Sequence, residues 1–374
     1  MAQTVFDPWN DPSAEPLIQF KNVTKRFGDF VAIDNLTIDI YAQEFFALLG
    51  PSGCGKTTLM RMLAGFETPT EGEITLQGQN IVPVPPNKRA VNMMFQSYAL
   101  FPHLSIWENI AFGLRREKMP KDAIKERVED MLRLTRLTQF AHRKPHQISG
   151  GQRQRVALAR SLAKAPKLLL LDEPLGALDK KLRQDTQFEL MDIQEKTGTT
   201  FVIVTHDQEE AMTVASRVAV MDNGKIKQVA TPDAIYEQPN SVYVADFIGD
   251  VNIIEGKATS EGEKVSISWA EGQPEIKGTS SIGFSKGQTC HFAIRPEKVS
   301  ISAERPDDAA NAVQGKIHDI AYLGNISTYY VRLSNGKIIK SQTANTRRLS
   351  RRSFTWEDDV WLSWTDTAGI LLEG

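Results

Sequence analysis

The stretch LLGPSGCGKTT, residues 48–58, decides the fold class of this chain. Its residues 50–57 match the spacing G-x-x-x-x-G-K-T, after the apolar run FFALL and before the helical pattern TTLMRMLAG. A glycine-rich turn between a strand and a helix lets backbone N–H groups close around a phosphate. The stretch therefore predicts an α/β fold with a phosphate-binding loop, formed by Gly50, Pro51, Ser52, Gly53, Cys54, Gly55, Lys56, Thr57 and Thr58.

Four side chains have a predicted chemical role in this fold. Lys56 is expected to reach the β- and γ-phosphates of a nucleotide, and the Thr57 hydroxyl to bind Mg²⁺. The run LLLLDEP, residues 168–174, reads as an apolar strand that ends in two carboxylates, at the edge where open α/β sheets bind ligands. We assign Asp172 to Mg²⁺, through the water shell of the ion, and Glu173 to the general base. The alternative is a solvated acidic turn, which the phosphate-binding loop in the same domain disfavours.

The composition is that of a globular chain long enough for two domains. The 374 residues are 41% hydrophobic and 24% charged, with a formal net charge of −2. That balance gives no general attraction to nucleic acid, so we expect no nucleic-acid partner. The longest apolar runs fall far short of the ~20 residues needed to cross a bilayer. Cys54 and Cys290 offer no disulfide framework, which favours a reducing cytoplasm.

The pattern along the chain predicts three parts. Residues 1–16 read as a flexible polar leader. Residues 17–249 alternate β-rich runs with helical patterns, which predicts a mostly parallel sheet between helices. The runs predicted as strands are LIQFKNVT, EFFALLG, GEITLQG, KLLLLDEP, TFVIVTH and RVAVMDNGKIKQV. Within them, residues 97–166 lack strand patterns and predict an inserted helical subdomain. Its core is expected from four apolar residues at helical spacing: Ile124, Val128, Met131 and Leu132.

The C-terminal part, residues 250–374, has a different sequence pattern. Brief alternating runs such as VSISW and DDVWLSW are separated by turn signals, and STYYVRLSNGKIIKSQ predicts a hairpin that turns at Asn335 and Gly336. A small β-barrel or sandwich fits this pattern better than a continued α/β sheet. The basic run TRRLSRRS, residues 346–353, is interpreted as a solvated loop.

The run ISGGQRQR, residues 148–155, resembles the signature motif of ATP-binding-cassette (ABC) ATPases, and it lies just upstream of LLLLDEP. Further stretches resemble other motifs of that family and occur along the chain in the same order as in the family. Gln96 in MMFQS resembles the Q-loop, Asp179 in ALD the D-loop, and His206 in VTHD the switch histidine. Phe27 in VTKRFG lies where the family carries an aromatic residue that stacks on adenine. From the residues alone, Phe27 could instead be strand core, and His206 a buried structural imidazole.

The resemblance implies a mechanism that needs two copies of the chain. In the family, two ATPase domains pack head to tail, and the signature of one protomer closes over the γ-phosphate held by the other. The signature residues here are Ser149, Gly150, Gly151 and Gln152. ATP and Mg²⁺ are the implied cofactors. Thr57, Gln96 and Asp172 are the residues implied to bind the metal, Asp172 through water. The implied catalytic residues are Lys56, Gln96, Glu173 and His206.

Two C-terminal stretches narrow the resemblance. FAIRPEKVSI at 292–301 and GKIHDIAYLGN at 315–325 resemble the OB-like, TOBE-type β-barrel of bacterial importer ATPases for sugars, polyamines, ferric iron and sulfate. NMMFQSYALFPH, IAYLGN and TWEDDVWLSW are most similar to importer ATPases for putrescine and other polyamines. Two integral membrane permease subunits are the implied partners, with a periplasmic or extracellular solute-binding protein acting indirectly. The implied location is the cytoplasmic face of the inner membrane, as a peripheral subunit.

Several alternatives stay open on the sequence. The segment 96–114 is a candidate docking site for permease subunits, with Tyr98, Phe101 and Trp107 as exposed aromatics, although these side chains could equally fill the subdomain core. The cargo could be another solute, and a soluble ABC ATPase without a transporter would use the same motifs. The C-terminal barrel could bind a small regulator or only brace a dimer.

Overall fold

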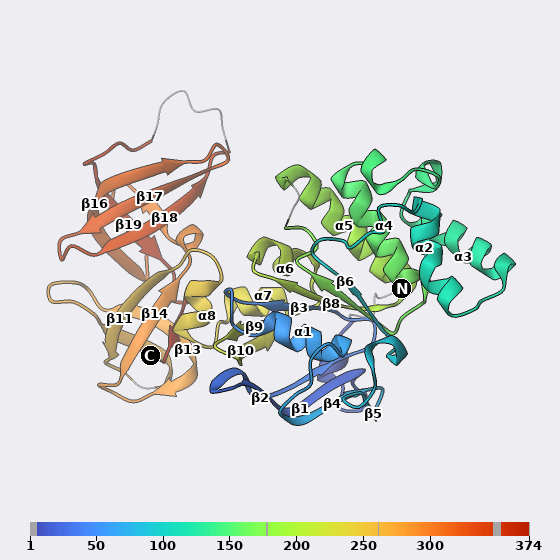
Figure 1. Ribbon diagram of the computed structural model, residues 1–374. Helices are drawn as coiled ribbons and strands as arrows, with labels where there is room; N and C mark the ends of the chain where they lie inside the picture. The colour runs from blue at the N-terminus through green and yellow to red at the C-terminus, as the bar shows by residue number, and fades with distance from the viewer. Residues whose placement is uncertain (1–5, 177–178, 261, 347–352, 374) are drawn as a thin grey trace. The chain divides into compact units, whose positions relative to one another are not determined.

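The chain forms two compact units, one up to Ile235 and one from Tyr236 onward, and each is described by itself (Figure 1). The division falls within helix α7 (Pro232–Glu237), earlier than the predicted boundary at 249. Helix α8 (Val242–Phe247) belongs to the second unit because Ala245 packs on Ala293 and Leu372. The computed structural model describes residues 6–176, 179–260, 262–346 and 353–373.

A six-stranded sheet forms the centre of the first unit. Its order is β10-β9-β3-β8-β7-β6, and all neighbours are parallel except β10 and β9. Strands β3 and β8 are buried along their whole length, which explains their continuous apolar sequences in place of alternation. The bounds are β3 Phe45–Leu49, β6 Val91–Met94, β7 Leu168–Asp172, β8 Thr200–Thr205, β9 Arg217–Asp222 and β10 Lys225–Ala230.

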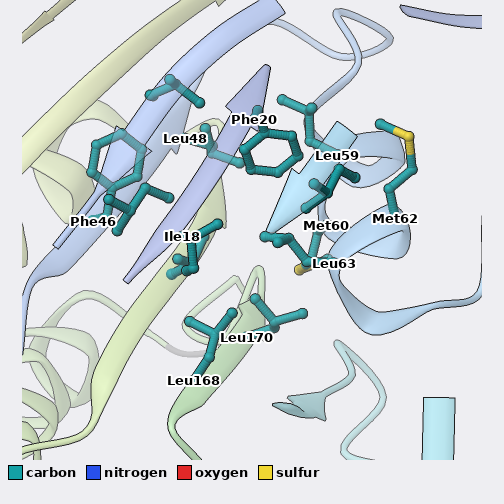
Figure 2. Packing of buried hydrophobic residues seen from close by; sticks show 14 of the residues in the cluster. Ile18, Phe20, Phe46, Leu48, Leu59, Met60, Met62, Leu63, Leu168 and Leu170 are labelled. Atoms are coloured by element: carbon teal, nitrogen blue, oxygen red, sulfur yellow. The ribbon is translucent and has the colours of Figure 1, made fainter. Parts of the chain in front are cut away.

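A four-stranded antiparallel sheet, in the order β2-β1-β4-β5, completes the strands of this unit. Its bounds are β1 Ile18–Phe27, β2 Phe30–Ile40, β4 Glu71–Leu76 and β5 Gln79–Asn80. Figure 2 shows side chains of both sheets packed around helix α1 (Lys56–Ala64) in one core. The labelled members are Ile18, Phe20, Phe46, Leu48, Leu59, Met60, Met62, Leu63, Leu168 and Leu170. This core fixes the start of α1, and therefore the phosphate-binding loop, against the central sheet.

The other helices include the predicted subdomain. Helices α2, α3 and α4 pack on one another, and the described residues from 97 to 166 contain no strand. The four apolar residues predicted for its core are all buried. The bounds are α2 Ile106–Arg116, α3 Lys121–Leu134, α4 Gly150–Ala163, α5 Lys180–Thr197 and α6 Gln208–Val214. Short 3-10 turns span η2 Pro86–Lys88, η3 Thr138–Phe140 and η4 Pro145–Gln147.

The N-terminal segment packs on the first unit at Trp9. Trp9 lies in a 3-10 turn (η1, Pro8–Asn10), and the Arg217 guanidinium lies 4.9 Å from the centre of its ring. Arg217 also pairs with the buried Glu44 at 2.7 Å. An aromatic ring over a partly desolvated guanidinium is a favourable contact, so it stabilises the segment at Trp9. That residues 1–16 form a flexible leader stays a prediction, and residues 1–5 lie outside the described residues.

The second unit is built from strands, as predicted. One sheet closes into a barrel in the order β11-β12-β13-β20-β14, and the other has the order β15-β19-β16-β17-β18. The predicted hairpin joins β17 and β18, and Gly336 at its turn has a φ of 83°, which favours glycine. A 3-10 turn, η5, spans Pro296–Lys298. The strand bounds are β11 Asn252–Ala258, β12 Gly262–Ser268, β13 Ile276–Phe284, β14 Thr289–Ile294, β15 Ser300–Ser302, β16 Asn311–Tyr322, β17 Ile326–Leu333, β18 Ile338–Ala344, β19 Asp359–Trp364 and β20 Gly369–Leu372.

Candidate active site

Four neighbouring strands place the predicted chemical groups along one edge of the central sheet. The phosphate-binding loop follows β3, Gln96 follows β6, Glu173 follows β7, and His206 follows β8. Because these strands are adjacent and parallel, their carboxyl ends meet at the same edge. Groups that are far apart in the sequence are thereby brought into one site.

The carboxylate of Glu173 is held from two sides. The Gln96 amide donates from Nε2 to Oε2 at 2.9 Å, and His206 Nδ1 lies 2.9 Å from Oε1. Glu173 itself has a φ of 42°, a conformation that costs a non-glycine residue energy and is found disproportionately at functional sites. The His206 side chain is 59% exposed, so the interpretation as a buried structural imidazole is wrong. The structure thus brings together three of the four predicted catalytic side chains.

The phosphate-binding loop has the geometry of an anion site. Helix α1 begins at Lys56 after Gly55, which has a φ of 106°, and no side chain caps its first N–H groups. Lys56 is 5% exposed, and its Nζ donates to the carbonyls of Gly50 at 2.7 Å and Pro51 at 2.9 Å. A Cβ on Gly50 would lie 2.4 Å from the Met221 carbonyl oxygen, so the loop needs glycine there. Among the described residues Lys56 has no carboxylate partner, and a buried ammonium beside uncapped amides fits phosphate groups.

The residues predicted for Mg²⁺ supply oxygen atoms, which this ion prefers. Thr57 lies in the first turn of α1, and Asp172 is the last residue of β7. Because Gln96 donates its Nε2 to Glu173, its Oε1 is left as the possible ligand atom. Burial raises the pKa of the Asp172 carboxyl above its ordinary value, and the neighbouring Glu173 charge raises it further. A bound cation would offset both effects, so the set fits Mg²⁺.

Phe27 lies at the end of β1 and is 47% exposed, so the alternative of strand core is wrong for this residue. The Lys25 ammonium lies 4.7 Å from the centre of its ring, and Lys25 in turn pairs with Glu67 at 2.7 Å. The exposed face of this half-exposed ring fits the predicted stacking on a planar base. That role stays a prediction.

The signature residues begin helix α4 with a reciprocal cap. The Ser149 hydroxyl accepts from the Gln152 amide at 3.3 Å, and the Gln152 side chain accepts from the Ser149 amide at 2.9 Å. This capping box uses two of the free N–H groups at the helix start and leaves those of Gly150 and Gly151. Within the described residues, no hydrogen bond links residues 149–152 to the loop at 50–58. The protomer therefore presents a second set of anion-binding amides apart from its first.

The D-loop lies partly outside the described residues, since Ala177 and Leu178 are not among them. Asp179 is described and caps helix α5, where its Oδ1 accepts from the Leu182 amide at 3.0 Å. Its predicted role at a dimer interface stays a prediction.

A polar group behind Glu173 was missed by the sequence argument. Arg183 Nη1 pairs with Asp207 Oδ2 at 2.5 Å, and the Asp207 amide donates to Thr205 Oγ1 at 3.0 Å. The Thr205 hydroxyl donates to Glu210, which is 2% exposed. With Glu173 and His206, these residues line a cavity of about 60 Å³. The spacing of Asp207 and Glu210 matches a capping box, a signal that could have placed them at a helix start beside His206.

Glu210→Gln is expected to remove a pH dependence of stability. Burial, together with the charges of Asp207 and Glu173, raises the pKa of Glu210 from 4.5 to about 7, although Thr205 and Arg183 oppose the shift. The folded state therefore favours the protonated acid, and this stabilisation is full below pH 4.5 and lost as the pH rises through 7. The loss is roughly 3 kcal/mol at most.

Urea unfolding at pH 5 and pH 8 tests this expectation. Glu209→Gln, an equal change at the neighbouring exposed residue, serves as the control. If wild type and Glu210→Gln lost the same free energy of unfolding between the two pH values, Glu210 would not be the group that titrates.

The fold and the site together define an ATP-binding cassette, and the chain belongs to the family of ABC transporter ATP-binding proteins. The ABC transporter family matches residues 33–176, and the TOBE domain family matches residues 292–372. Two solved structures support the fold. The dimeric ATP-binding cassette MJ0796 with ADP and Pi is 31% identical, with a TM-score of 0.51 over 57% of this chain and 98% of that one. CbiO1 from Clostridium perfringens is 27% identical, with a TM-score of 0.56 over 59% of this chain and 90% of that one.

Two curated relatives match nearly the whole chain. The putrescine transport ATP-binding protein PotG of Escherichia coli (strain K12) is 50% identical over 96% of this chain and 95% of that protein. The spermidine/putrescine import ATP-binding protein PotA of Protochlamydia amoebophila (strain UWE25) is 47% identical over 95% and 96%. Both domains of the chain are therefore shared with these relatives. No helix within the described residues is long and apolar enough to span a membrane.

Proposed function

We propose that the chain hydrolyses ATP with bound Mg²⁺ as a dimer of two copies and thereby powers the uptake of putrescine or a related polyamine. The observation that supports the cargo is the 50% identity, across both domains, to a putrescine transport ATP-binding protein. The observation that supports hydrolysis is the carboxylate of Glu173, held at a strand end between Gln96 and His206. The proposed location is the cytoplasmic face of the inner membrane.

In this proposal each side chain of the site has one task. Glu173 orients the attacking water in line with the γ-phosphate and accepts a proton from that water. Lys56 stabilises the charge that develops on the transferring phosphoryl group, and His206 contacts the γ-phosphate. Thr57, Gln96 and Asp172 would hold Mg²⁺, which supplies further positive charge at the β- and γ-phosphates.

The signature supports the requirement for a second copy. Its capping box leaves the amides of Gly150 and Gly151 without a partner in the described part of the protomer. Amides at a helix start favour an anion, and the γ-phosphate held by a second copy is the anion we propose. The related cassette MJ0796 was solved as a dimer with ADP and Pi. Closure around ATP and reopening after hydrolysis then form the power stroke.

Arg160 provides a physical connection between the signature helix and the proposed docking segment, residues 96–114. It lies on α4, and its guanidinium donates to the carbonyls of Ala99 at 2.7 Å and Tyr98 at 2.8 Å. Both of these residues have positive φ, 45° for Ala99 and 62° for Tyr98, so the turn depends on such support. We propose that a movement of α4 on closure reaches the two permease subunits through this contact, and the solute-binding protein through them.

The aromatics of the docking segment are more buried than predicted. Tyr98, Phe101 and Trp107 are half-buried, and Phe101 packs on Phe112 with ring centres 4.4 Å apart. Phe112 itself is 36% exposed. These rings therefore fill the subdomain and still leave apolar surface at its edge, which supports docking of a membrane subunit.

Arg160→Gln is expected to uncouple transport from hydrolysis. The change removes two hydrogen bonds from a charged donor, so we expect at least ~10-fold lower uptake in the assembled transporter. Hydrolysis by the isolated subunit should change little, because Arg160 touches none of the catalytic residues. Arg143→Gln, at an exposed position of the same subdomain, is the control. Equal losses of uptake and of isolated ATPase activity would contradict the coupling role.

The cargo is tested by uptake in cells whose own copy of this gene is deleted. Wild type should restore uptake of labelled putrescine, and Glu173→Gln should not. Labelled spermidine, ferric iron, sulfate and maltose are measured in parallel. Restored uptake of one of the last three, without putrescine, would overturn the cargo and leave the ATPase intact. Full ATPase activity without any restored uptake would favour a cassette that acts outside transport.

A further inference from the structure

The second unit contains a large cavity that the ATPase function does not use. Its volume is about 720 Å³, within the range of small-molecule sites. It lies on one face of the β15-β19-β16-β17-β18 sheet, the face to which the exposed, alternate residues of β16 point. The loop around Gln273 forms one wall of the cavity. Gln273 Nε2 donates to Ser334 Oγ at 2.8 Å, which fixes this wall to the end of β17.

Two cations of the lining face each other directly. Lys316 on β16 is the register partner of Arg332 on β17, so both side chains point to the same face of the sheet. Like charges in directly opposite positions destabilise a sheet. On its other side Lys316 is the register partner of Asp359 on β19, with the Lys316 Nζ 3.9 Å from Asp359 Oδ1. Both of these side chains are more than half exposed, so solvent screens this attraction as it screens the repulsion. The sheet therefore places two exposed cations side by side at the cavity, with Asp359 next to Lys316 and farther from Arg332.

Two arginines of the lining have no acidic partner among the residues that the structure describes. Arg332 Nη2 lies 2.8 Å from His318 Nε2, a contact in which the imidazole nitrogen must be the unprotonated acceptor. The Arg305 guanidinium lies 5.5 Å from the centre of the Trp361 ring. Within the described part of the chain, neither guanidinium is within 4.0 Å of a carboxylate. Each keeps further N–H donors for a ligand.

We propose that this cavity binds a small, multiply charged anion that carries phosphate or carboxylate groups. Arginine forks match both groups in paired hydrogen bonds, and Arg305 is already oriented by Trp361. The negative charge of the anion would offset the repulsion between Lys316 and Arg332. Glu357 and Asp359 also line the cavity, so a singly charged anion would gain little, and a multiply charged one is favoured.

Hydrogen exchange read by mass spectrometry on the full-length chain tests the proposal. Saturating MgADP fills the nucleotide site, and the probes are inorganic phosphate, pyrophosphate and citrate. Peptides covering residues 311–334 should show saturable protection with at least one of them. Because each charged hydrogen bond contributes at least ~1.5 kcal/mol, Arg332→Gln and Arg305→Gln should each raise the apparent Kd about 10-fold or more.

Lys264→Gln is the matched control, since Lys264 lies on β12, is 82% exposed and does not line the cavity. It should leave the protection unchanged. The proposal is overturned if none of the three anions protects residues 311–334, or if the two arginine variants bind as well as wild type. Protection by spermidine and not by the anions would also overturn the proposal. It would show that Glu357 and Asp359 make this a site for cations.

A second measurement needs no ligand. Without an anion, Arg332→Gln should raise the apparent Tm of the second unit, because it removes one member of the opposed pair while a donor to His318 remains. A lower Tm in this variant, with unchanged protection by the anions, would show that Arg332 serves the sheet and not a ligand.

Discussion

Glu173→Gln is expected to lower ATP turnover at least ~10²-fold while ATP still binds. The amide keeps the shape of the side chain, and it can still meet His206 and a flipped Gln96, which now hold the carboxylate at 2.9 Å each. What is lost is the group that accepts a proton from water. Because the phosphate-binding loop is untouched, ATP should continue to join two copies. Phosphate release measures the first effect, and size-exclusion chromatography with ATP shows the accumulated dimers.

Glu209→Gln is the control for this change, since it removes a carboxylate from an exposed position close to His206. Its turnover should equal that of wild type. Near-wild-type hydrolysis by purified Glu173→Gln would refute the assignment of the base. Loss of ATP binding in the same variant would instead show that Glu173 supports the nucleotide and not the water.

Gly151→Asp is expected to abolish dimer closure and hydrolysis while each protomer still binds ATP. The protomer has room for the side chain, because a Cβ on Gly151 would lie 3.4 Å from Leu182 Cδ2, an ordinary contact. An acid in the first turn of α4 also interacts favourably with the helix dipole, so folding should not suffer. In a closed dimer, however, the carboxylate would face a γ-phosphate in a poorly hydrated site, where like charges repel strongly.

Gly151→Asn separates charge from bulk in this experiment, because it has the same shape without the charge. It should impair closure less than Gly151→Asp. ATP binding is measured by fluorescent nucleotide at concentrations where the chain is monomeric. If Gly151→Asp prevented ATP binding by monomers, the signature would act on its own protomer and the dimer argument would fail.

Heterodimers sharpen the test. A Gly151→Asp chain paired with a Lys56→Ala chain has one site that carries both changes and one that carries neither. Such purified heterodimers should recover some hydrolysis, or at least one closed site detected by nucleotide crosslinking. Complete failure of both readouts would contradict action in trans.

Short contiguous motifs allowed much of this protein to be predicted from sequence. The phosphate-binding loop works through backbone atoms of neighbouring residues, so its spacing alone specifies its geometry. The buried strands β7 and β8 were predicted because parallel strands covered on both faces are continuously apolar. The helical subdomain and the hairpin at Gly336 were predicted for similarly local reasons, a helical repeat and a turn residue.

Strands β2 and β6 were not predicted, for two different reasons. Strand β2 alternates buried and exposed residues only in part, and polar residues interrupt it at Asp34 and Asn35. Strand β6 has four residues, too few for a pattern, and its place beside β7 comes from the sheet. The contact between Trp9 and Arg217 was not predicted, because the two residues are distant in the sequence.

The sequence by itself determined the class of protein, the residues of the nucleotide site and the existence of a C-terminal barrel, because each is written in neighbouring residues. Only the tertiary structure decided which groups meet. Glu173 lies between Gln96 and His206 because three adjacent strands end at one edge, and Arg160 supports Tyr98 and Ala99 because α4 packs beside the loop after β6. The opposed Lys316 and Arg332 depend in the same way on strand register. Such contacts join residues whose separation along the chain carries no local signal, so packing and register alone specify them.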